Sequence, residues 1–313
     1  SGGFLKFMKD YPNARPYASN AGVGIMLKQY FKSYDFQRVK TGDTLSTGRY
    51  TLTFVEMPMI HWPDNMLTYV AEQKIAFSND AFGQHIASYD IFDDAHGAAK
   101  CIDRAKDYYA NIVMPYGMQV ANKLKQIQDM NLDIDMIAPA HGIIWRSYLP
   151  ELFQAYEDFA TFKAVDKAVI VYESVWKHTQ MMAEALAEGM GRNGICVKIF
   201  KCSMTSPAII QKELLDAKAV LVGSGNYNNA MAGSIAAFLE KLITCKVKNK
   251  KGLGFGSYGW ANLVTKEINA RLGKAGITLL NDEVVSQNYT PSEADLDALM
   301  ELGKQIAEEI KAM

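Results

Sequence analysis

The chain has 313 residues, of which 49% are hydrophobic and 21% are charged, so it has the composition of a globular protein long enough for two domains. Its 33 Lys and Arg residues nearly balance its 34 Asp and Glu residues, giving a formal net charge of −1. This balance argues against nucleic acid or an anionic membrane as the main partner.

The four cysteines are too few and too scattered for a disulfide framework or a thiolate metal cluster, which fits a reducing, cytoplasmic location. No apolar run approaches the roughly 18–20 residues that span a bilayer, so no membrane segment is expected. The chain starts with Ser1-Gly2-Gly3 and has no basic segment leading into an apolar run, so we expect no signal peptide there.

Three apolar segments in the first half are predicted as strands, and each ends in a residue that can bind a metal. They cover residues 50–61, 74–80 and 135–141, and their last residues are His61, Asp80 and His141. A long helical stretch over residues 98–130 is expected to break near Pro115, and a further helix is expected over residues 148–162.

Strands and helices alternate over the second half, which predicts a doubly wound parallel sheet with helices on both faces. The expected strands cover residues 167–172, 195–200, 219–223, 252–256 and 277–280. The expected helices cover residues 179–190, 206–216, 230–244, 260–274 and 291–312. A short hinge near residues 163–167 predicts two domains, residues 1–164 and residues 165–313.

His61, Asp80 and His141 are expected at one edge of a sheet, because each follows an apolar strand. A single histidine at a strand end is more often a hydrogen-bonded structural residue, but two histidines with a carboxylate suit Fe, Zn or Mn. A carboxylate between two histidines can also bridge two metal ions. The pattern therefore predicts a metal centre in which these three residues are the ligands.

The loop after the first strand of the second half opens a helix and has the residues to bind a phosphate. It consists of Glu173, Ser174, Val175, Trp176, Lys177, His178 and Thr179. Backbone N–H groups at the helix N-terminus can hold an anion, with hydroxyl groups completing the site. The glycine patterns of the common nucleotide loops are absent from it, and a helix simply capped by Thr179 is the alternative.

Two further loops follow the third and fourth strands, at the carboxyl ends where open α/β sheets bind ligands. Their residues are Ser224, Gly225, Asn226, Tyr227, Asn228 and Asn229 in one, and Ser257, Tyr258, Gly259 and Trp260 in the other. Both loops combine glycine with aromatic side chains that can stack on a planar ring. Three such loops in one sheet indicate a single cofactor site.

These three loops resemble, in order, the phosphate loop and the two flavin-binding loops of flavodoxin-like domains. The resemblance covers about residues 165–313. It implies that FMN is bound, with its phosphate at residues 174–179 and the two edges of its flavin at residues 224–229 and 257–260. The bulky Trp176-Lys177-His178 segment departs from the smaller residues that flavodoxins often have there.

The first half resembles the second part of a metallo-β-lactamase-like αββα domain, in which His61 matches the histidine after the central strand, Asp80 the bridging aspartate and His141 the last histidine. Such a domain joined to a flavodoxin-like domain resembles the flavodiiron proteins, the A-type flavoproteins that include rubredoxin:oxygen oxidoreductases and nitric oxide reductases. The family's first ligand cluster, H-x-E-x-D-H, is absent. Since Ser-Gly-Gly commonly follows that cluster, we expect that this sequence lacks the N-terminal segment.

The resemblance implies an oxidoreductase with FMN and a di-iron site. FMN would take electrons from rubredoxin or another small redox protein, and the di-iron site would reduce O₂ to water or NO to N₂O. A head-to-tail homodimer is also implied. A basic run formed by Lys246, Lys248, Lys250 and Lys251 is either a solvated turn or a docking patch for an acidic electron carrier. The alternatives are a di-metal hydrolase and a flavodoxin-like electron carrier with an incomplete or inactive lactamase-like domain.

Overall fold

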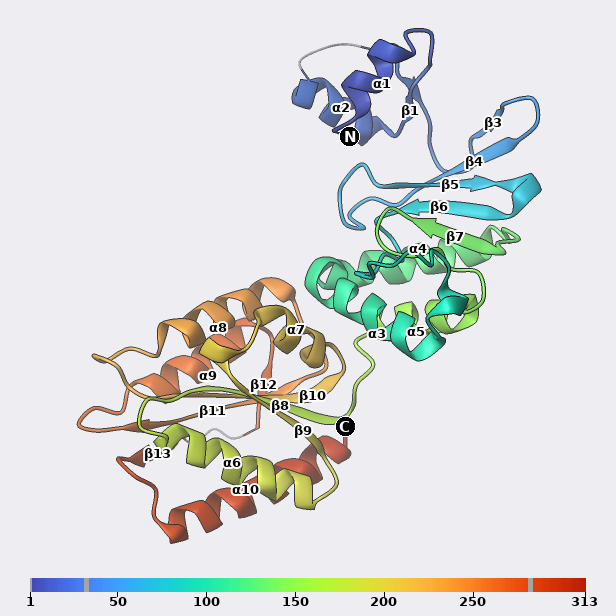
Figure 1. The fold of residues 1–313 in the computed structure, drawn as a ribbon. Helices are drawn as coiled ribbons and strands as arrows, with labels where there is room; N and C mark the ends of the chain where they lie inside the picture. The colour runs from blue at the N-terminus through green and yellow to red at the C-terminus, as the bar shows by residue number, and fades with distance from the viewer. Residues whose placement is uncertain (1, 31–33, 281–283) are drawn as a thin grey trace. The chain divides into compact units, whose positions relative to one another are not determined.

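The computed structural model describes residues 2–30, 34–280 and 284–313 and divides the chain into two compact units (Figure 1). The N-terminal unit comprises Ser1–Tyr108 and Met118–Glu157, and the C-terminal unit comprises Tyr109–Gly117 and Asp158–Met313. The units therefore interleave along the chain. Each unit has its own sheet and its own set of buried apolar side chains.

A five-stranded sheet in the order β3-β4-β5-β6-β7 forms the centre of the N-terminal unit. Its strands are β3 (Thr44–Ser46), β4 (Thr51–Glu56), β5 (Met66–Val70), β6 (Ile75–Asn79) and β7 (Met136–Pro139). β5 pairs antiparallel with both β4 and β6, whereas β6 and β7 pair parallel. β4, β6 and β7 consequently run in one direction and end at the same edge of the sheet, as the sequence predicts.

Helices α3, α4 and α5 lie along one side of this sheet (Figure 1). The burial of β6 alternates accordingly, since Ala76 and Ser78 are fully buried while Phe77 is half-exposed. These helices are α3 (Ala98–Tyr108), α4 (Gly117–Asp129) and α5 (Leu149–Ala160). The other elements of this unit are α1 (Phe4–Asp10), β1 (Tyr17–Ala18), α2 (Asn20–Tyr30), β2 (Gln37–Arg38), η1 (Ala71–Gln73) and η2 (Asp93–Ala95).

The long helical stretch is interrupted where the sequence predicts. After α3 the chain forms a π-helical turn, η3 (Tyr109–Val113), and a 3₁₀ turn, η4 (Met114–Tyr116), before α4 begins. Pro115 lies in η4, where its missing N–H and fixed φ disfavour a continuous α-helix. The Nε2 of Gln211 donates to the Ala110 carbonyl at 2.8 Å, which holds this segment within the C-terminal unit.

The C-terminal unit is a parallel sheet with helices on both faces, which confirms the prediction (Figure 1). Its strand order is β12-β11-β10-β8-β9, and β13 also pairs parallel with β11. The strands are β8 (Val165–Glu173), β9 (Cys196–Lys201), β10 (Ala217–Ser224), β11 (Lys251–Tyr258), β12 (Thr278–Leu279) and β13 (Val285–Asn288). The order reverses beside β8, so the carboxyl ends of β8 and β10 form the switch point where such sheets bind ligands.

Two helices cover one face of this sheet and three cover the other (Figure 1). The first pair is α6 (His178–Arg192) and α10 (Glu293–Lys311), and the second group is α7 (Pro207–Leu215), α8 (Gly233–Cys245) and α9 (Val264–Lys274), with the short η5 (Cys202–Met204) before α7. Ala168 and Ile170 of β8 pack in the core with α6 and α10, and the alternate residues Val169 and Val171 are equally buried. Burial on both faces explains why β8 is a continuous apolar run.

Candidate metal centre and cofactor pocket

His61, Asp80 and His141 meet at the carboxyl edge of the N-terminal sheet. The Nε2 of His61 lies 3.6 Å from Asp80 Oδ2, and the Nε2 of His141 lies 3.3 Å from Asp80 Oδ1. Ligand atoms about 2.1 Å from one metal ion lie roughly 3.0–3.6 Å apart at bond angles of about 90–120°, so each histidine and its carboxylate oxygen fit two ligands of one ion. β4 ends at Glu56, so His61 lies in the following loop rather than on the strand.

The two histidines face different oxygens of the same carboxylate, which fits Asp80 between two metal positions. Among the residues that the structure describes, no three His, Cys, Asp or Glu side chains gather around a single point as the ligands of one ion would. The described residues thus offer one imidazole and one carboxylate oxygen to each position. This donor set suits iron, zinc or manganese.

Asp80 sits in a compact turn directly after β6. The Ser78 hydroxyl donates to the Ala81 carbonyl at 2.6 Å, and the Gly83 N–H donates to the Asp80 carbonyl at 3.2 Å. Phe82 adopts a φ of +65°, and its ring is buried 4.6 Å from the Tyr156 ring. Burial of the aromatic ring offsets the strain of that backbone conformation and holds the turn in place.

Two buried amide side chains connect this turn to the histidine loops, and neither is predicted from the sequence. Asn65 accepts a hydrogen bond from Asn79 at 2.6 Å and donates to the carbonyl of Ile60, so it links the residues that precede Asp80 and His61. Gln84 makes the corresponding connection to the loop of His141.

Tyr108 adds an aromatic hydroxyl to the same region. Its ring lies 5.8 Å from the ring of His141 and 5.1 Å from that of His85. The buried hydroxyl has no hydrogen-bond partner within the described part of the chain. Burial, with a smaller contribution from the charge of Asp80, raises the pKa of this hydroxyl, so it stays protonated at neutral pH.

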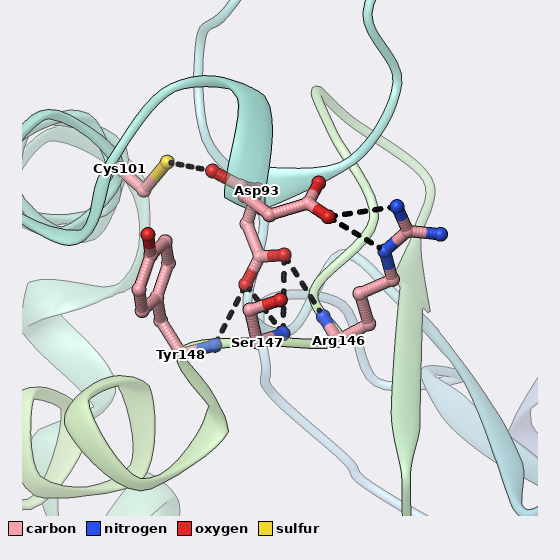
Figure 2. Close-up of polar contacts among 6 residues, drawn as sticks. Asp93, Cys101, Arg146, Ser147 and Tyr148 are labelled. Carbon is pink, nitrogen blue, oxygen red and sulfur yellow. Dashed lines mark hydrogen bonds and ion pairs between the residues drawn. The ribbon is translucent and has the colours of Figure 1, made fainter.

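Asp93 secures the segment that follows His141 (Figure 2). Its carboxylate is fully buried and accepts backbone N–H groups from Arg146, Ser147 and Tyr148 at 2.9–3.2 Å, immediately before α5 begins. The Cys101 thiol donates to the Asp93 carbonyl at 3.6 Å. A buried carboxylate surrounded by backbone donors fixes the chain strongly, because each of these hydrogen bonds is charge-assisted.

A cavity of about 670 Å³ opens at the carboxyl ends of β8, β10 and β11 in the C-terminal unit. It is lined by Ser174, Val175, Trp176, His178, Thr179, Gly225, Asn226, Tyr227, Ser257, Tyr258, Gly259, Trp260 and Tyr289. All but Tyr289 belong to the three predicted loops, and Tyr289 directly follows β13. The volume and the aromatic lining suit a planar cofactor.

The entrance to α6 is arranged to bind an anion. The helix begins at His178, and the preceding Lys177 has a φ of +68° and provides no side-chain cap, so the first N–H groups of α6 are left for a ligand. Thr179 lies inside the helix, so the alternative in which it is the N-cap is wrong. Its hydroxyl lies 2.9 Å from that of Ser257, which connects the first and third loops.

Asn226 provides a second feature that suits a bound ring. Its Nδ2 donates to the Ala261 carbonyl, whereas its buried Oδ1 has no partner in the described residues. A ligand N–H group that entered the cavity could satisfy this oxygen, which otherwise carries a desolvation cost.

Five of the predicted cofactor residues do not line the cavity. Glu173 accepts hydrogen bonds from the Ser203 N–H and the Ser234 hydroxyl, and the Ser224 hydroxyl is used within its own loop. Lys177, Asn228 and Asn229 are exposed and have positive φ angles, which place them in turns of the backbone. These three residues therefore determine the backbone shape of the loops.

The basic run does not form the four-lysine docking patch that was one expectation. Lys250 is buried, and its Nζ donates to the carbonyls of Leu215 and Ala217. Lys251 forms an ion pair with Glu309 at 2.8 Å. Lys250, directly before β11, is turned inward, so the run is not a continuous charged surface.

Comparison with known proteins matches each half of the chain to a family. Residues 170–303 match flavodoxin, and residues 3–142 match the ODP family beta lactamase. The chain is 41% identical to a nitric oxide reductase of Moorella thermoacetica over 312 residues, which are 99% of this chain and 78% of that protein. The chain belongs to the flavodiiron proteins.

Solved structures agree with this assignment. Rubredoxin oxygen:oxidoreductase from Desulfovibrio gigas is 33% identical with a TM-score of 0.96, over 99% of this chain and 78% of that one. The flavodiiron protein of Giardia intestinalis is 26% identical with a TM-score of 0.93, over 98% of this chain and 75% of that one. The predicted family, the lactamase-like and flavodoxin-like fold class, the oxidoreductase class, and FMN and di-iron as cofactors are thereby confirmed.

The structure also bears on the cysteines and on the expected absence of a membrane segment. All four cysteines are free, as their spacing predicts. In the described residues, no helix combines the length and the apolar character that a membrane crossing requires. The cytoplasmic location stays a prediction.

Proposed function

We propose that this flavodiiron protein reduces NO to N₂O, with FMN in the C-terminal cavity and with His61, Asp80 and His141 among the ligands of two irons. The observation that carries the proposal is that Asp80 presents one carboxylate oxygen to each histidine, 3.6 and 3.3 Å away. The 41% identity to a nitric oxide reductase along almost the whole chain favours NO as the substrate.

At the metal centre, this chain's residues would position the ligands and supply a hydrogen-bond donor. A pair of irons, when bound, supplies two adjacent one-electron centres. Asp80 would contribute one carboxylate oxygen to each iron, and the amides of Asn65 and Gln84 fix the backbone beside the histidines. The protonated hydroxyl of Tyr108, buried without a partner in the described residues, is available to hydrogen-bond a substrate oxygen.

In the cavity of the C-terminal unit, the uncapped N-terminus of α6 would hold the FMN phosphate. The largely exposed rings of Trp176 and Trp260 are available to stack on the flavin, and Asn226 Oδ1 would accept a ring N–H. FMN accepts electrons in pairs and can release them one at a time, which suits transfer to metal ions.

Reduction of O₂ to water is the second candidate, favoured by the similarity to an oxygen oxidoreductase with a TM-score of 0.96. The name of that relative also supports a rubredoxin-like protein as the electron donor. We further propose the head-to-tail homodimer implied by the family resemblance. Light scattering of the purified protein would test whether two subunits associate.

The deciding experiment measures iron, FMN and gas consumption on wild type and Asp80→Asn. The substitution removes the negative charge shared by the two metal positions, so we expect iron content and NO consumption to fall at least about tenfold while FMN content is unchanged. Asp94→Asn is the matched control, because Asp94 pairs with Arg146 on the surface.

Each alternative gives a distinct result in the same assay. If the protein consumes O₂ but does not consume NO, O₂ is the substrate and the proposal of NO reduction is wrong. Purified protein that contains zinc and no iron would favour a di-metal hydrolase. Protein that contains FMN and no metal would favour a flavodoxin-like electron carrier. Full iron content and full NO consumption in Asp80→Asn would exclude the proposed metal centre.

A further inference from the structure

Gln84 is a fully buried amide in the N-terminal unit, and within the described part of the chain its hydrogen bonds are with the segment that carries His141. Its Nε2 donates to the Ile143 carbonyl at 2.8 Å, and its Oε1 accepts the Ile143 N–H at 2.7 Å. Its own backbone N–H donates to the His141 carbonyl at 3.3 Å. One residue thus holds the backbone on both sides of Gly142.

Gly142 allows this contact to form. It has a φ of +86°, and a Cβ atom placed on it would lie 1.6 Å from Gln84 Oε1. No other amino acid fits against the amide at this position, both because of the collision and because of the left-handed backbone. The turn that follows His141 is therefore complementary in shape to the Gln84 side chain.

The His141 side chain itself has little packing to fix its direction. It is 53% exposed, whereas that of Asp80 is 14% exposed. Among the described residues, its ring lies 5.8 Å from the Tyr108 ring, and its Nε2 lies 3.3 Å from Asp80 Oδ1. The direction of the imidazole consequently depends on how firmly its backbone is held.

We propose that Gln84 is a positioning residue that aims the His141 imidazole at Asp80 through the backbone of residues 141–143. Asp93 secures the same segment further along, at residues 146–148, so the His141 end depends on Gln84 (Figure 2). This inference rests on the proposed role of His141 as a metal ligand, and it assigns Gln84 no contact with metal or substrate.

Binding of Co²⁺, followed by its visible absorption, tests the inference without an activity assay. Gln84→Met keeps the volume but removes both side-chain hydrogen bonds, so we expect the Kd for Co²⁺ to rise about tenfold, as for other residues that orient metal ligands. Gln211→Met in the C-terminal unit is the matched control, since Gln211 is another buried amide that donates to a backbone carbonyl. It should lower stability and leave the Kd unchanged.

Double variants distinguish positioning of His141 from a general loosening of the unit. In a His141→Ala background, Gln84→Met should cause no further loss of Co²⁺ affinity, whereas in a His61→Ala background it should keep its full tenfold effect. Equal effects in the two backgrounds, or no effect of Gln84→Met in the wild type, would overturn the proposal. An unchanged Kd in His141→Ala alone would instead refute the proposed metal role of His141.

A second substitution covers the case in which Gln84→Met does not fold. Gln84→Glu keeps the shape and the acceptor for the Ile143 N–H and removes the donor to the Ile143 carbonyl. We expect a rise in the Kd for Co²⁺ that again disappears in the His141→Ala background. A rise that persists there would count against Gln84 acting through His141.

Discussion

At the scale of single residues, we expect Glu173 to make the segment after β8 sensitive to acid. Burial by itself raises the pKa of this carboxyl, but hydrogen bonds from Ser203, Ser174 and Ser234 outweigh burial and lower the pKa below its ordinary value of 4.5. Because the pKa is lowered in the folded state, Glu173 stabilises the fold fully above pH 4.5. This contribution is lost as the pH falls through the lowered pKa.

We therefore expect Glu173→Gln to flatten the fall in melting temperature of the C-terminal unit below about pH 4.5. Thermal unfolding followed by circular dichroism at a series of pH values measures this slope. The exposed Glu188, on α6 of the same unit, is the control, and Glu188→Gln should leave the slope as in the wild type. A slope that Glu173→Gln does not change would show that the hydrogen bonds to Glu173 do not stabilise the fold.

The residues that could be predicted from the sequence are those that stand at strand ends. His61, Asp80 and His141 follow apolar strands, and the topology brings such ends to one edge. Gln84 could not be found in this way, because its partner Ile143 lies 59 residues away and nothing local marks the pair. Tyr289 cannot be found from the sequence for a related reason, since it follows β13, a short strand that pairs with the last residues of β11.

At the scale of elements, α6 and α10 pack closely through two glycines. A Cβ atom on Gly189 would lie 2.0 Å from the Met300 carbonyl oxygen, and one on Gly303 would lie 2.5 Å from the Leu186 carbonyl oxygen. The backbones of the two helices therefore approach each other more closely than most side chains allow.

Gly189→Ala should destabilise the C-terminal unit by about 1–3 kcal/mol, because the added methyl group forces the helices apart. Gly191→Ala, two residues along the same helix, meets nothing within 4 Å and should stabilise it by about 0.5–1 kcal/mol through its higher helix propensity. Urea unfolding gives both values. Equal changes in the two variants would mean that the close approach does not limit stability.

The elements of the second half are more predictable than those of the first. β8 and β10 are buried on both faces, so they appear in the sequence as apolar runs between helices. β5 carries Thr68 between two buried residues and does not stand out in the sequence, because a strand with one packed face has a weaker hydrophobic signal. The small elements α1, β1, α2 and β2 were also missed, since they bury few side chains.

At the scale of the whole molecule, the two units should respond differently to FMN. The cofactor cavity is lined by residues of the C-terminal unit. A ligand stabilises the part that binds it, by about 2.7 kcal/mol at a free concentration 100 times its Kd. Calorimetry of flavin-free protein with and without added FMN should show one transition move upward and another stay in place. Equal shifts of both transitions would contradict separate units.

The interleaving of the units limits where the chain can be divided into fragments that fold. Tyr109, Val113 and Met114 are buried and belong to the C-terminal unit, although the 40 residues of Met118–Glu157, which belong to the other unit, separate them from the rest of it. A recombinant fragment that began at Val165 would lose them, and the backbone acceptor of Gln211 with them. Moving the C-terminal unit into another enzyme thus requires the nine residues Tyr109–Gly117 as well, or a replacement segment that packs against α7.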